Sequence, residues 1–326
     1  MYKTKLNITD TQYAIAKLKK DFSKELSKKL RLVRVSAPLF LTTESGLNDG
    51  LNGETPVLFK AKNIDSNLEI VHSLAKWKRE ALHKYNIALH HGIYTDMNAI
   101  RREEDLDATH SFYVDQWDWE RNIEYSDRNV DTLKQTVKLL FEALKNTEDK
   151  INDKYSELSK KLPDELFFIT SDELYNLYPN IPAEQREYEI VKKHKAVFII
   201  GIGNNLPDNK PHSKRAKDYD DWSLNGDMIV YHPTLDIALE ISSMGIRVDS
   251  KALMKQYAME KSDIEKISPY HHAIVNDLLP YTIGGGLGQS RIAMFLLEKA
   301  HIGEVQVSYW SDTEKDKCKK ENIVLL

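Results

Sequence analysis

The sequence predicts an α+β protein with a mainly antiparallel sheet flanked by helices. Three observations support this class: two long segments with apolar residues at helical spacing, a strand whose two faces differ, and β-branched runs interspersed with helical ones. No internal repeat, low-complexity tract or proline- or serine-rich linker interrupts the chain. We therefore expect a single catalytic domain over residues 1–326, with 311–326 as a variable tail.

The first long helix is predicted to follow Thr9 and Asp10, either of which can cap its start. Its apolar residues recur three and four positions apart, at Ile15, Leu18, Phe22, Leu26 and Leu30. The next run, LVRVSAPLFL, is β-branched and apolar but contains Pro38, which cannot donate a ladder hydrogen bond. We expect this proline-bearing strand at a sheet edge or a subunit boundary.

The strand that begins at Phe112, FYVDQWDWE, has a polar face. A period of two separates the residues at 112, 114, 116, 118 and 120 from those at 113, 115, 117 and 119. Gln116, Asp118 and Glu120 thus project in a row from one face. Trp117 and Trp119 are expected to pack as the back wall of the sheet on the other face.

Further elements are predicted by the same patterns. The expected strands lie near 57–61, 68–71, 93–100, 196–203, 226–231 and 237–248, and the expected helices near 72–82, 129–160, 184–194, 269–279 and after 288. A polar loop ending in DYDDW precedes the last pair of long strands.

Composition excludes several classes of protein. Lys and Arg number 46 against 50 for Asp and Glu, which gives a formal charge of -4 and no broad basic field for a stable nucleic-acid partner. The single cysteine, Cys318, allows neither an intrachain disulfide nor a CxxC metal site. No signal-like or membrane-spanning apolar run is present. We expect a cytoplasmic protein without a membrane partner.

Two motifs place arginine beside glycine or a short loop. In GGGLGQSR, Arg291 follows a glycine-rich segment that lets a ligand approach the backbone, although a structural turn with a surface arginine has the same pattern. In IRREED, residues 100–105, Arg101 can hold a phosphate and Glu104 can accept from an exocyclic amine. The alternative for IRREED is a solvated hairpin loop.

The strand DIALEISSMGIRV contains polar residues among apolar ones. Glu240 and Ser243 could share Mg²⁺ bound to ATP phosphates, because oxygen ligands suit that ion. Strict alternation would put these two side chains on opposite faces, so this interpretation requires a bulge or a strand end. The alternative is an internal ion pair between Glu240 and Arg247.

Together these segments resemble a known family. The proline-bearing strand RVSAPLF, the Arg101 to Glu104 loop and GGGLGQSR are similar to the three signature motifs of class II aminoacyl-tRNA synthetases. More closely, HSLAKWKR, VDQWDWER, DYDDW, LNGD, EISSMGIRVD and TIGGGLGQSR resemble the bacterial ammonia-dependent asparagine synthetases. The resemblance runs from about residue 10 to 310, and the KDKCKK run beyond it is expected to be a solvated end.

The resemblance implies a class II synthetase-like catalytic domain and a homodimer whose interface includes the Pro38 strand. It implies ATP and Mg²⁺ as cofactors and the following ATP site: Arg101 on the α-phosphate, Glu104 near adenine, Arg291 on the nucleotide, and Glu240 with Asp227 near the metal and ribose. It implies an aspartate pocket made of Asp49, Ser73, Lys78, Gln116, Asp118, Asp220, Ser243 and Arg247, with Arg101, Asp49 and Gln116 as the catalytic group.

The reaction expected from this resemblance is ATP-dependent amidation of aspartate with ammonia through a β-aspartyl-adenylate, releasing AMP and pyrophosphate. Familiar members carry a glycine-containing insertion between Trp222 and Leu224 that this chain lacks. The chain begins Met1-Tyr2 and Cys318 lies in a charged tail, so neither offers a nucleophile for taking nitrogen from glutamine. Asp49, in LNDGLNG, is the candidate for holding ammonium and accepting its proton, unless it only orders its own turn.

Two other classes remain as alternatives. An aspartate-group aminoacyl-tRNA synthetase would need an anticodon-binding domain, for which the chain offers no spare length before its first helix. A catalytically silent synthetase-like protein would have no need for Arg101, Glu240 and Arg291 together.

Overall fold

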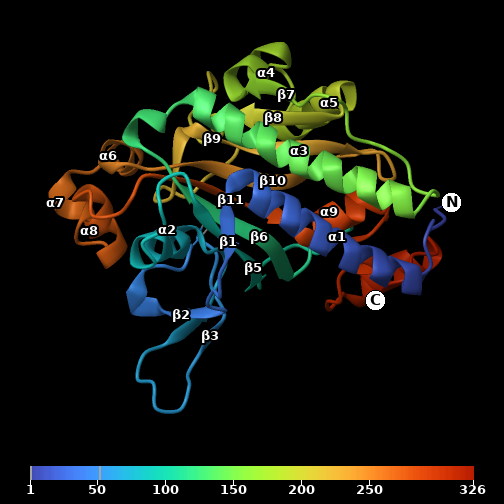
Figure 1. Cartoon of the computed structure of the whole chain (residues 1–326), viewed down its shortest axis with the longest axis horizontal. Coiled ribbons are helices and arrows are strands. Elements are labelled where there is room, and N and C mark those ends of the chain that lie inside the picture. The colour runs from blue at the N-terminus through green and yellow to red at the C-terminus, as the bar shows by residue number, and fades with distance from the viewer. Residues whose placement is uncertain (1, 51–52) are drawn as a thin grey trace.

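The computed structural model describes residues 2–50 and 53–326. Met1 and residues 51–52 of the expected loop 44–53 lie outside the described residues. The described part of the chain contains one large sheet, one small sheet and helices packed around them (Figure 1).

Within the described residues the large sheet has eight strands in the order β1-β5-β6-β11-β10-β9-β8-β7. All its pairings are antiparallel except β1 with β5 and β7 with β8, at the two edges. The expectation of a mainly antiparallel sheet is therefore confirmed. The strands are β1 Leu32–Arg34, β5 Gly92–Ile100, β6 Tyr113–Asn122, β7 Phe167–Thr170, β8 Ala196–Ile200, β9 Asp220–His232, β10 Ile237–Arg247 and β11 Thr282–Gly288.

The small sheet corrects one prediction. The run LVRVSAPLFL forms two strands rather than one: β1 at the edge of the large sheet, and β2, Phe40–Thr42, in the small sheet. Pro38 lies in the irregular segment between them, because its missing N–H and fixed φ suit a change of direction. The small sheet also contains β3, Leu58–Phe59, and β4, Leu68–Ile70, and it projects from the lower side of the view in Figure 1.

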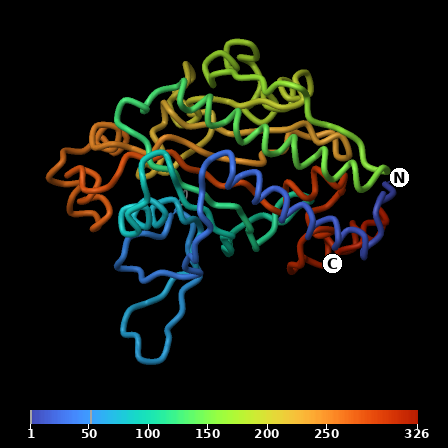
Figure 2. Tube along the Cα trace, in the orientation of Figure 1, coloured from blue at the N-terminus to red at the C-terminus, as the bar shows by residue number. Residues whose placement is uncertain are grey.

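Two long helices cover one face of the large sheet. Helices α1, Ile8–Leu30, and α3, Val130–Lys154, contact each other and run side by side across the strands (Figures 1 and 2). The Phe22 ring lies 4.5 Å from that of Trp117, and Trp117 and Trp119 are fully buried beneath the helices. The back-wall prediction is thus confirmed, and the polar row of β6 faces the opposite side. Asn7, not Thr9 or Asp10, caps α1, since its side chain accepts from the Asp10 N–H.

The remaining helices frame the sheet's ends and its other face. They are α2 Ala75–Lys84, α4 Ser171–Leu177, α5 Ala183–His194, α6 Ser250–Tyr257, α7 Lys261–Ile264, α8 Pro269–Val275, α9 Gln289–Leu296 and α10 Asp312–Lys320, with short 3-10 turns η1 Thr43–Ser45, η2 Tyr125–Asp127 and η3 Ile302–Glu304. None of the helices in the described residues is long and apolar enough to cross a membrane.

The C-terminal segment is more ordered than its composition suggests. The prediction of a solvated end is wrong for its apolar residues: Cys318 on α10 and Ile323 beyond it are buried, and the Leu326 N–H donates to the Gly303 carbonyl. Alternating lysines and acids along α10 keep its outer face polar while Cys318 turns inward. Figure 2 shows the two ends of the chain on the same side of the molecule.

Candidate active site

A polar cavity of about 300 Å³ lies on the face of the large sheet opposite α1 and α3. Its floor comes from β6, β10 and β11, and its walls from α2 and from the loops around residues 101–111 and 214–220. The predicted site residues that line it are Asp49, Ser73, Lys78, Arg101, Glu104, Gln116, Asp118, Asp220, Glu240, Ser243, Arg247 and Arg291. Asp227 is the predicted site residue that does not line it among the described residues.

The glycine motif makes room on the cavity floor. Its glycines lie inside β11 rather than in a loop, opposite the polar residues of β6: Gly284 pairs with Glu120, Gly286 with Asp118 and Gly288 with Gln116. A Cβ at Gly284 would lie 1.9 Å from Glu120 Oε2, and one at Gly286 would lie 2.3 Å from Gln116 Oε1. Long polar side chains from β6 can therefore extend across β11 only because β11 has no side chains there.

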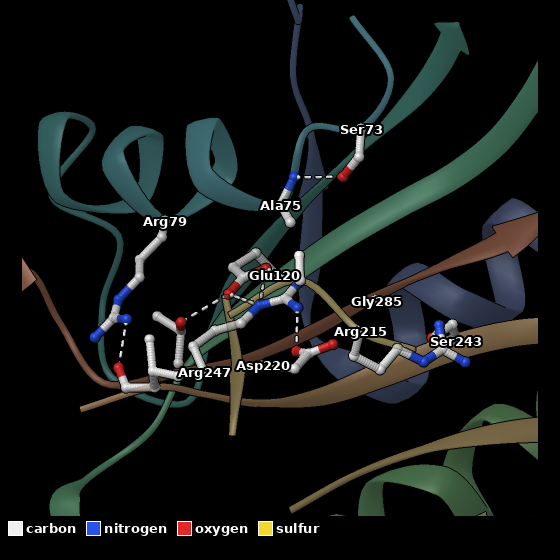
Figure 3. A network of polar contacts seen from close by, with 12 residues as sticks. Ser73, Ala75, Arg79, Glu120, Arg215, Asp220, Ser243, Arg247 and Gly285 are labelled. Carbon is white, nitrogen blue, oxygen red and sulfur yellow. Dashed lines mark hydrogen bonds and ion pairs between the residues drawn. The ribbon is translucent and has the colours of Figure 1, made fainter. Parts of the chain in front are cut away.

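A buried ionic cluster forms the deep end of the cavity. Arg247 donates to both oxygens of Glu120, with Nε to Oε1 at 2.9 Å and Nη2 to Oε2 at 2.7 Å, and its Nη1 donates to Asp220 (Figure 3). Lys78, from α2, donates to Asp118 and to the Trp119 carbonyl. The side chains of Lys78, Glu120 and Arg247 are at most 2% exposed. The cluster is thus held before any substrate arrives.

Partners rather than water stabilise the charges of Glu120 and Arg247, whereas burial lowers the pKa of Lys78 and raises the pKa of Asp220. Burial opposes ionisation of Glu120, but the Arg247 guanidinium outweighs it and holds the pKa of Glu120 below its ordinary value. Burial likewise opposes the charge of Arg247, yet Glu120 and Asp220 raise its pKa well above the usual range. The sequence pattern placed Glu120 on the polar face but gave it no role. The feature that indicates a role is that this carboxylate lies opposite a glycine of β11.

The proposed ion pair between Glu240 and Arg247 is absent from the described residues, where Arg247 pairs with Glu120 and Asp220 instead. The register of β10 with β9 shifts between Glu240 and Ser242. Such an irregularity is required if Glu240 and Ser243 are to lie on the same face of the sheet. Glu240 and Ser243 consequently both line the cavity. The requirement for a bulge is confirmed.

The outer end of the cavity carries charges that are held loosely. Arg101 follows β5, and its Nη1 lies 4.0 Å from Glu104 Oε2, with both side chains about a quarter exposed, at 26% and 23%. Arg291, on the first turn of α9, donates only to main-chain oxygens among the described residues, with Nη1 3.1 Å from the Glu240 carbonyl. Arg101, Glu104 and Arg291 thus face the cavity, whereas Arg102, Glu103 and Asp105 are exposed, so the alternative of a solvated loop holds for those three residues.

A third arginine, which sequence reasoning missed, lies over the middle of the floor. Arg215 pairs with Asp227, and its Nη1 donates to the Ser243 hydroxyl at 3.2 Å. It comes from the loop between β8 and β9, where no periodicity marks it, and the only signal was its place among charged residues just before DYDDW. Asp227 is thereby covered, which explains why it does not line the cavity.

The residues predicted to hold Mg²⁺ fit that ion unequally. The Glu240 carboxylate faces the cavity without a hydrogen bond or ion pair among the described residues, and one carboxylate with substrate phosphates is a usual Mg²⁺ environment. Ser243 and Asp227 instead offer their oxygens to Arg215. Glu240 is therefore the ready ligand, and the other two become available only if Arg215 moves.

Two other predicted residues, Asp49 and Ser73, also line the cavity. Asp49 is almost fully buried and lines the cavity, and the Ser73 hydroxyl accepts from the Ala75 N–H at the start of α2. Trp222–Leu224, where an insertion was expected to be missing, lie within the bounds of β9, in the stretch where its register with β10 shifts between the pairs Asn225–Gly245 and Asp220–Arg247.

One further group in the described residues has metal-ligand chemistry, namely His301, Glu314 and Cys318. His301 Nδ1 accepts from the Gly303 N–H, which places the ring proton on Nε2, beside Glu314. A metal on Nε2 would force the proton onto Nδ1, against the Gly303 donor. The geometry therefore favours a hydrogen-bonded cap over a metal centre.

Comparison with known proteins agrees with this geometry. An aspartate-ammonia ligase family model matches residues 9–322. The aspartate–ammonia ligase of Fusobacterium nucleatum is 54% identical over 326 residues, covering 100% of this chain and 99% of that protein. That of Bacillus mycoides is 52% identical and covers 100% of both.

Solved structures with the same fold are asparaginyl-tRNA synthetases. The enzyme of Pyrococcus horikoshii, complexed with asparaginyl-adenylate, has a TM-score of 0.65 at 17% identity, over 91% of this chain and 68% of that one. That of Entamoeba histolytica, also with asparaginyl-adenylate, has a TM-score of 0.62 at 15% identity, over 92% of this chain and 66% of that one. The fold is thus that of class II aminoacyl-tRNA synthetase catalytic domains. By its sequence, the chain belongs to the aspartate-ammonia ligase family.

Proposed function

We propose that this ligase converts L-aspartate, ammonia and ATP into L-asparagine, AMP and pyrophosphate through a β-aspartyl-adenylate. The observation that carries the proposal is the division of one cavity into two ends. The deep end holds the buried cluster of Lys78, Asp118, Glu120 and Arg247. The outer end holds Arg101, 4.0 Å from Glu104, and Arg291, whose hydrogen bonds in the described residues go to main-chain oxygens. The first end suits an amino acid and the second suits phosphates.

The deep end is suited to a zwitterion. Its two cations, Lys78 and Arg247, face three carboxylates, those of Asp118, Glu120 and Asp220, so the cluster is close to neutral with a surplus of negative charge. In this proposal Asp118 receives the α-ammonium of aspartate, while Lys78 and Arg247 hold its α-carboxylate. Ser73, Asp220 and Ser243 complete the pocket. Holding the α-carboxylate here leaves the side-chain carboxylate directed at ATP.

The outer end supplies positioning and electrostatics for adenylation. Aspartate's carboxylate is unreactive toward ammonia, because oxide is a poor leaving group. Its side-chain oxygen therefore attacks the α-phosphorus of ATP, and the bond to the pyrophosphate oxygen breaks. Arg101 and Arg291 balance the charge that develops on the phosphates, Glu104 accepts from the adenine amine, and Gln116 orients the reacting carboxylate. Mg²⁺, held by Glu240 with Ser243 and Asp227 near it, would add electrostatic neutralisation of the phosphates.

Ammonia completes the reaction in this proposal. Asp49 binds ammonium inside the cavity and accepts its proton, so that the free lone pair attacks the acyl carbon and AMP leaves. The near-complete burial of Asp49 supports a role inside the cavity rather than in a surface turn.

We further propose a cytoplasmic homodimer that joins through the segment around Pro38. Exposed apolar side chains gather there: Val33, Leu39 and Phe40 are each about half exposed, at 52%, 51% and 45%. An obligate interface should bury at least about 1,600 Å² in total. Light scattering at micromolar concentration should give twice the chain mass, and a fully active monomer would refute the dimer.

One assay tests the function. Protein, ATP, Mg²⁺ and ¹⁴C-aspartate are incubated with ammonium, with glutamine or with tRNA, and the products are separated. The proposal requires that labelled asparagine, together with AMP, is formed when ammonium is supplied. Labelled aspartyl-tRNA would support a tRNA synthetase instead, and asparagine made equally well from glutamine would overturn the ammonia assignment.

A further inference from the structure

The loop between β8 and β9 holds Arg215 over the cavity on a fixed backbone. Before Arg215, the Ser213 N–H donates to the Ile202 carbonyl, and His212 lies 2.8 Å from Glu187. After it, the Ala216 and Lys217 carbonyls accept from Trp222 and Gln256. Anchors on both sides leave the side chain of Arg215 as the part of this segment that can move without disturbing the fold.

The guanidinium of Arg215 occupies the place of a cation. It lies between Asp227 and Ser243, which are register partners on β9 and β10, and the Glu240 carboxylate contributes to the electrostatic attraction that it feels. It is also incompletely bonded, because Arg215 Nε and Asp227 Oδ1 are both buried and have no hydrogen-bond partner in the described residues. A guanidinium has five N–H donors, so most of its capacity is unused here.

The position matters because it lies between the two ends of the cavity. Along β10, Arg247 marks the deep end and Glu240 the outer end, and Ser243 lies between them. Figure 3 shows Arg215 reaching Ser243 beside the Arg247 cluster. Any group at Ser243 is therefore next to the place where the aspartate carboxylate and the α-phosphate must meet.

We propose that Arg215 is a displaceable cation, which pairs with Asp227 and Ser243 while the nucleotide site is empty and moves onto the ATP phosphates when Mg²⁺ and ATP enter together. This inference rests on the proposed function, because ATP brings both the divalent ion and new anionic partners for the arginine. The number of ion pairs stays the same in this exchange. Asp227 loses the guanidinium and binds a metal ion, and Arg215 loses the carboxylate and binds a phosphate. Metal without nucleotide offers Arg215 no new partner, so the site should resist metal alone.

The decisive measurement is the affinity for metal in the absence of nucleotide. It is measured by titration calorimetry with Mn²⁺ as the probe. Arg215→Ala removes the resident cation and leaves Asp227 and Glu240 exposed to the solvent, so it should bind Mn²⁺ at least about tenfold more tightly than the wild type. In Arg215→Ala/Asp227→Asn this gain should disappear. Arg215→Lys keeps the charge and should bind Mn²⁺ as weakly as the wild type.

Turnover supplies the second half of the test. Aspartate-dependent exchange of pyrophosphate into ATP should fall about 10²-fold in Arg215→Ala, through kcat more than through the KM for aspartate, because a phosphate contact is lost. Lys217→Ala, an exposed lysine in the same loop that does not line the cavity, is the matched control and should show no gain in Mn²⁺ affinity.

Each other outcome overturns the proposal. Reduced exchange without tighter Mn²⁺ binding means that Arg215 stays paired with Asp227, and a fall in thermal stability alone means that the pair is only structural. If Arg215→Ala does not fold, Arg215→Gln replaces it, since the amide keeps most of the size without the charge. The calorimetry needs neither aspartate nor ammonia, so a wild-type protein that failed to make asparagine would refute the proposed function and leave this test intact.

Discussion

The two ends of the cavity hold their charges in opposite ways. At the deep end, Glu120, Arg247 and Lys78 are buried and bonded to one another, whereas at the outer end Arg101 and Glu104 are a quarter exposed and 4.0 Å apart. A buried ion pair is stable only when its geometry and hydrogen bonds are nearly complete, while an exposed pair contributes little. The charges of the deep end are therefore fixed in the folded chain, and those of the outer end are free to move toward a ligand.

This contrast explains how one sheet can serve two different ligands. The deep end comes from β6, the end of β10, the start of β9 and helix α2, whose charged side chains fix one another through ion pairs. The outer end comes from a loop after β5 and the first turn of α9, where side chains have space to follow a phosphate chain. Selectivity for a small amino acid requires side chains in fixed positions. Binding a phosphate chain requires long side chains that can move to meet it.

The largest effect should come from breaking the deep cluster. Glu120→Gln leaves Arg247 buried with only Asp220 as an anionic partner, and should lower the free energy of unfolding by about 3–5 kcal/mol. The matched change at the outer end, Glu104→Gln, should alter it by less than about 0.5 kcal/mol. Urea unfolding followed by circular dichroism measures both. Equal losses would show that the two ends do not differ in rigidity.

Acid should reveal the same difference. The pKa of Glu120 is lowered in the folded protein, so its contribution to stability is fully present above the ordinary value of 4.5 and is lost as the pH falls through the lowered pKa. The stability gap between the wild type and Glu120→Gln should therefore narrow below about pH 4.5. Urea midpoints measured from pH 7 downward would contradict this if the gap stayed constant.

At the outer end, function should suffer and stability should not. Arg101→Ala removes a phosphate clamp and should slow aspartate-dependent exchange of pyrophosphate into ATP by about 10²–10³-fold. Its thermal midpoint should stay within a degree or two of the wild type, about the shift that 0.5 kcal/mol produces in a chain of this size. Arg102→Ala, next to it and exposed, is the control. Exchange at the wild-type rate in Arg101→Ala would remove that residue from the site.

A change at Asp49 should affect the second half-reaction alone. Asp49→Asn keeps the size of the side chain but cannot accept a proton, so it should still form aspartyl-adenylate and convert it to asparagine about 10²-fold more slowly. A higher ammonium requirement should accompany this loss. Quenched-flow separation of adenylate and asparagine measures the two steps, with Glu44→Gln, exposed in the same segment, as the control. Full asparagine synthesis by Asp49→Asn would discard the role.

What the sequence could and could not predict follows from the range of the forces involved. Alternation along β6 is local, so it correctly separated Gln116 and Asp118 from the tryptophans behind them. The bonding of Arg247 to Glu120 depends on a glycine in a third strand, and the pairing of Arg215 with Asp227 depends on how a loop folds back over the sheet. No local pattern encodes either contact. The helix cap at Asn7 and the division of the strand at Pro38 were missed for a local reason. Several neighbouring residues could equally well have capped the helix or ended the strand.

The smallest effect is expected at Glu240, at the outer end of β10. Its carboxylate faces the cavity without a partner in the described residues, so Glu240→Gln breaks no ion pair and should leave the free energy of unfolding unchanged. The amide keeps the shape but loses the charge that attracts a divalent ion, and the ATP phosphates still supply most of the coordination. About tenfold more Mg²⁺ should therefore restore the exchange rate, a shift of about 1.4 kcal/mol in metal binding. Asp236→Asn, in the exposed turn between β9 and β10, is the control for charge removed from the same hairpin. An unchanged Mg²⁺ requirement in Glu240→Gln would take Glu240 out of the metal environment and leave Arg291, bonded to its carbonyl, as the main tie between this strand and the nucleotide.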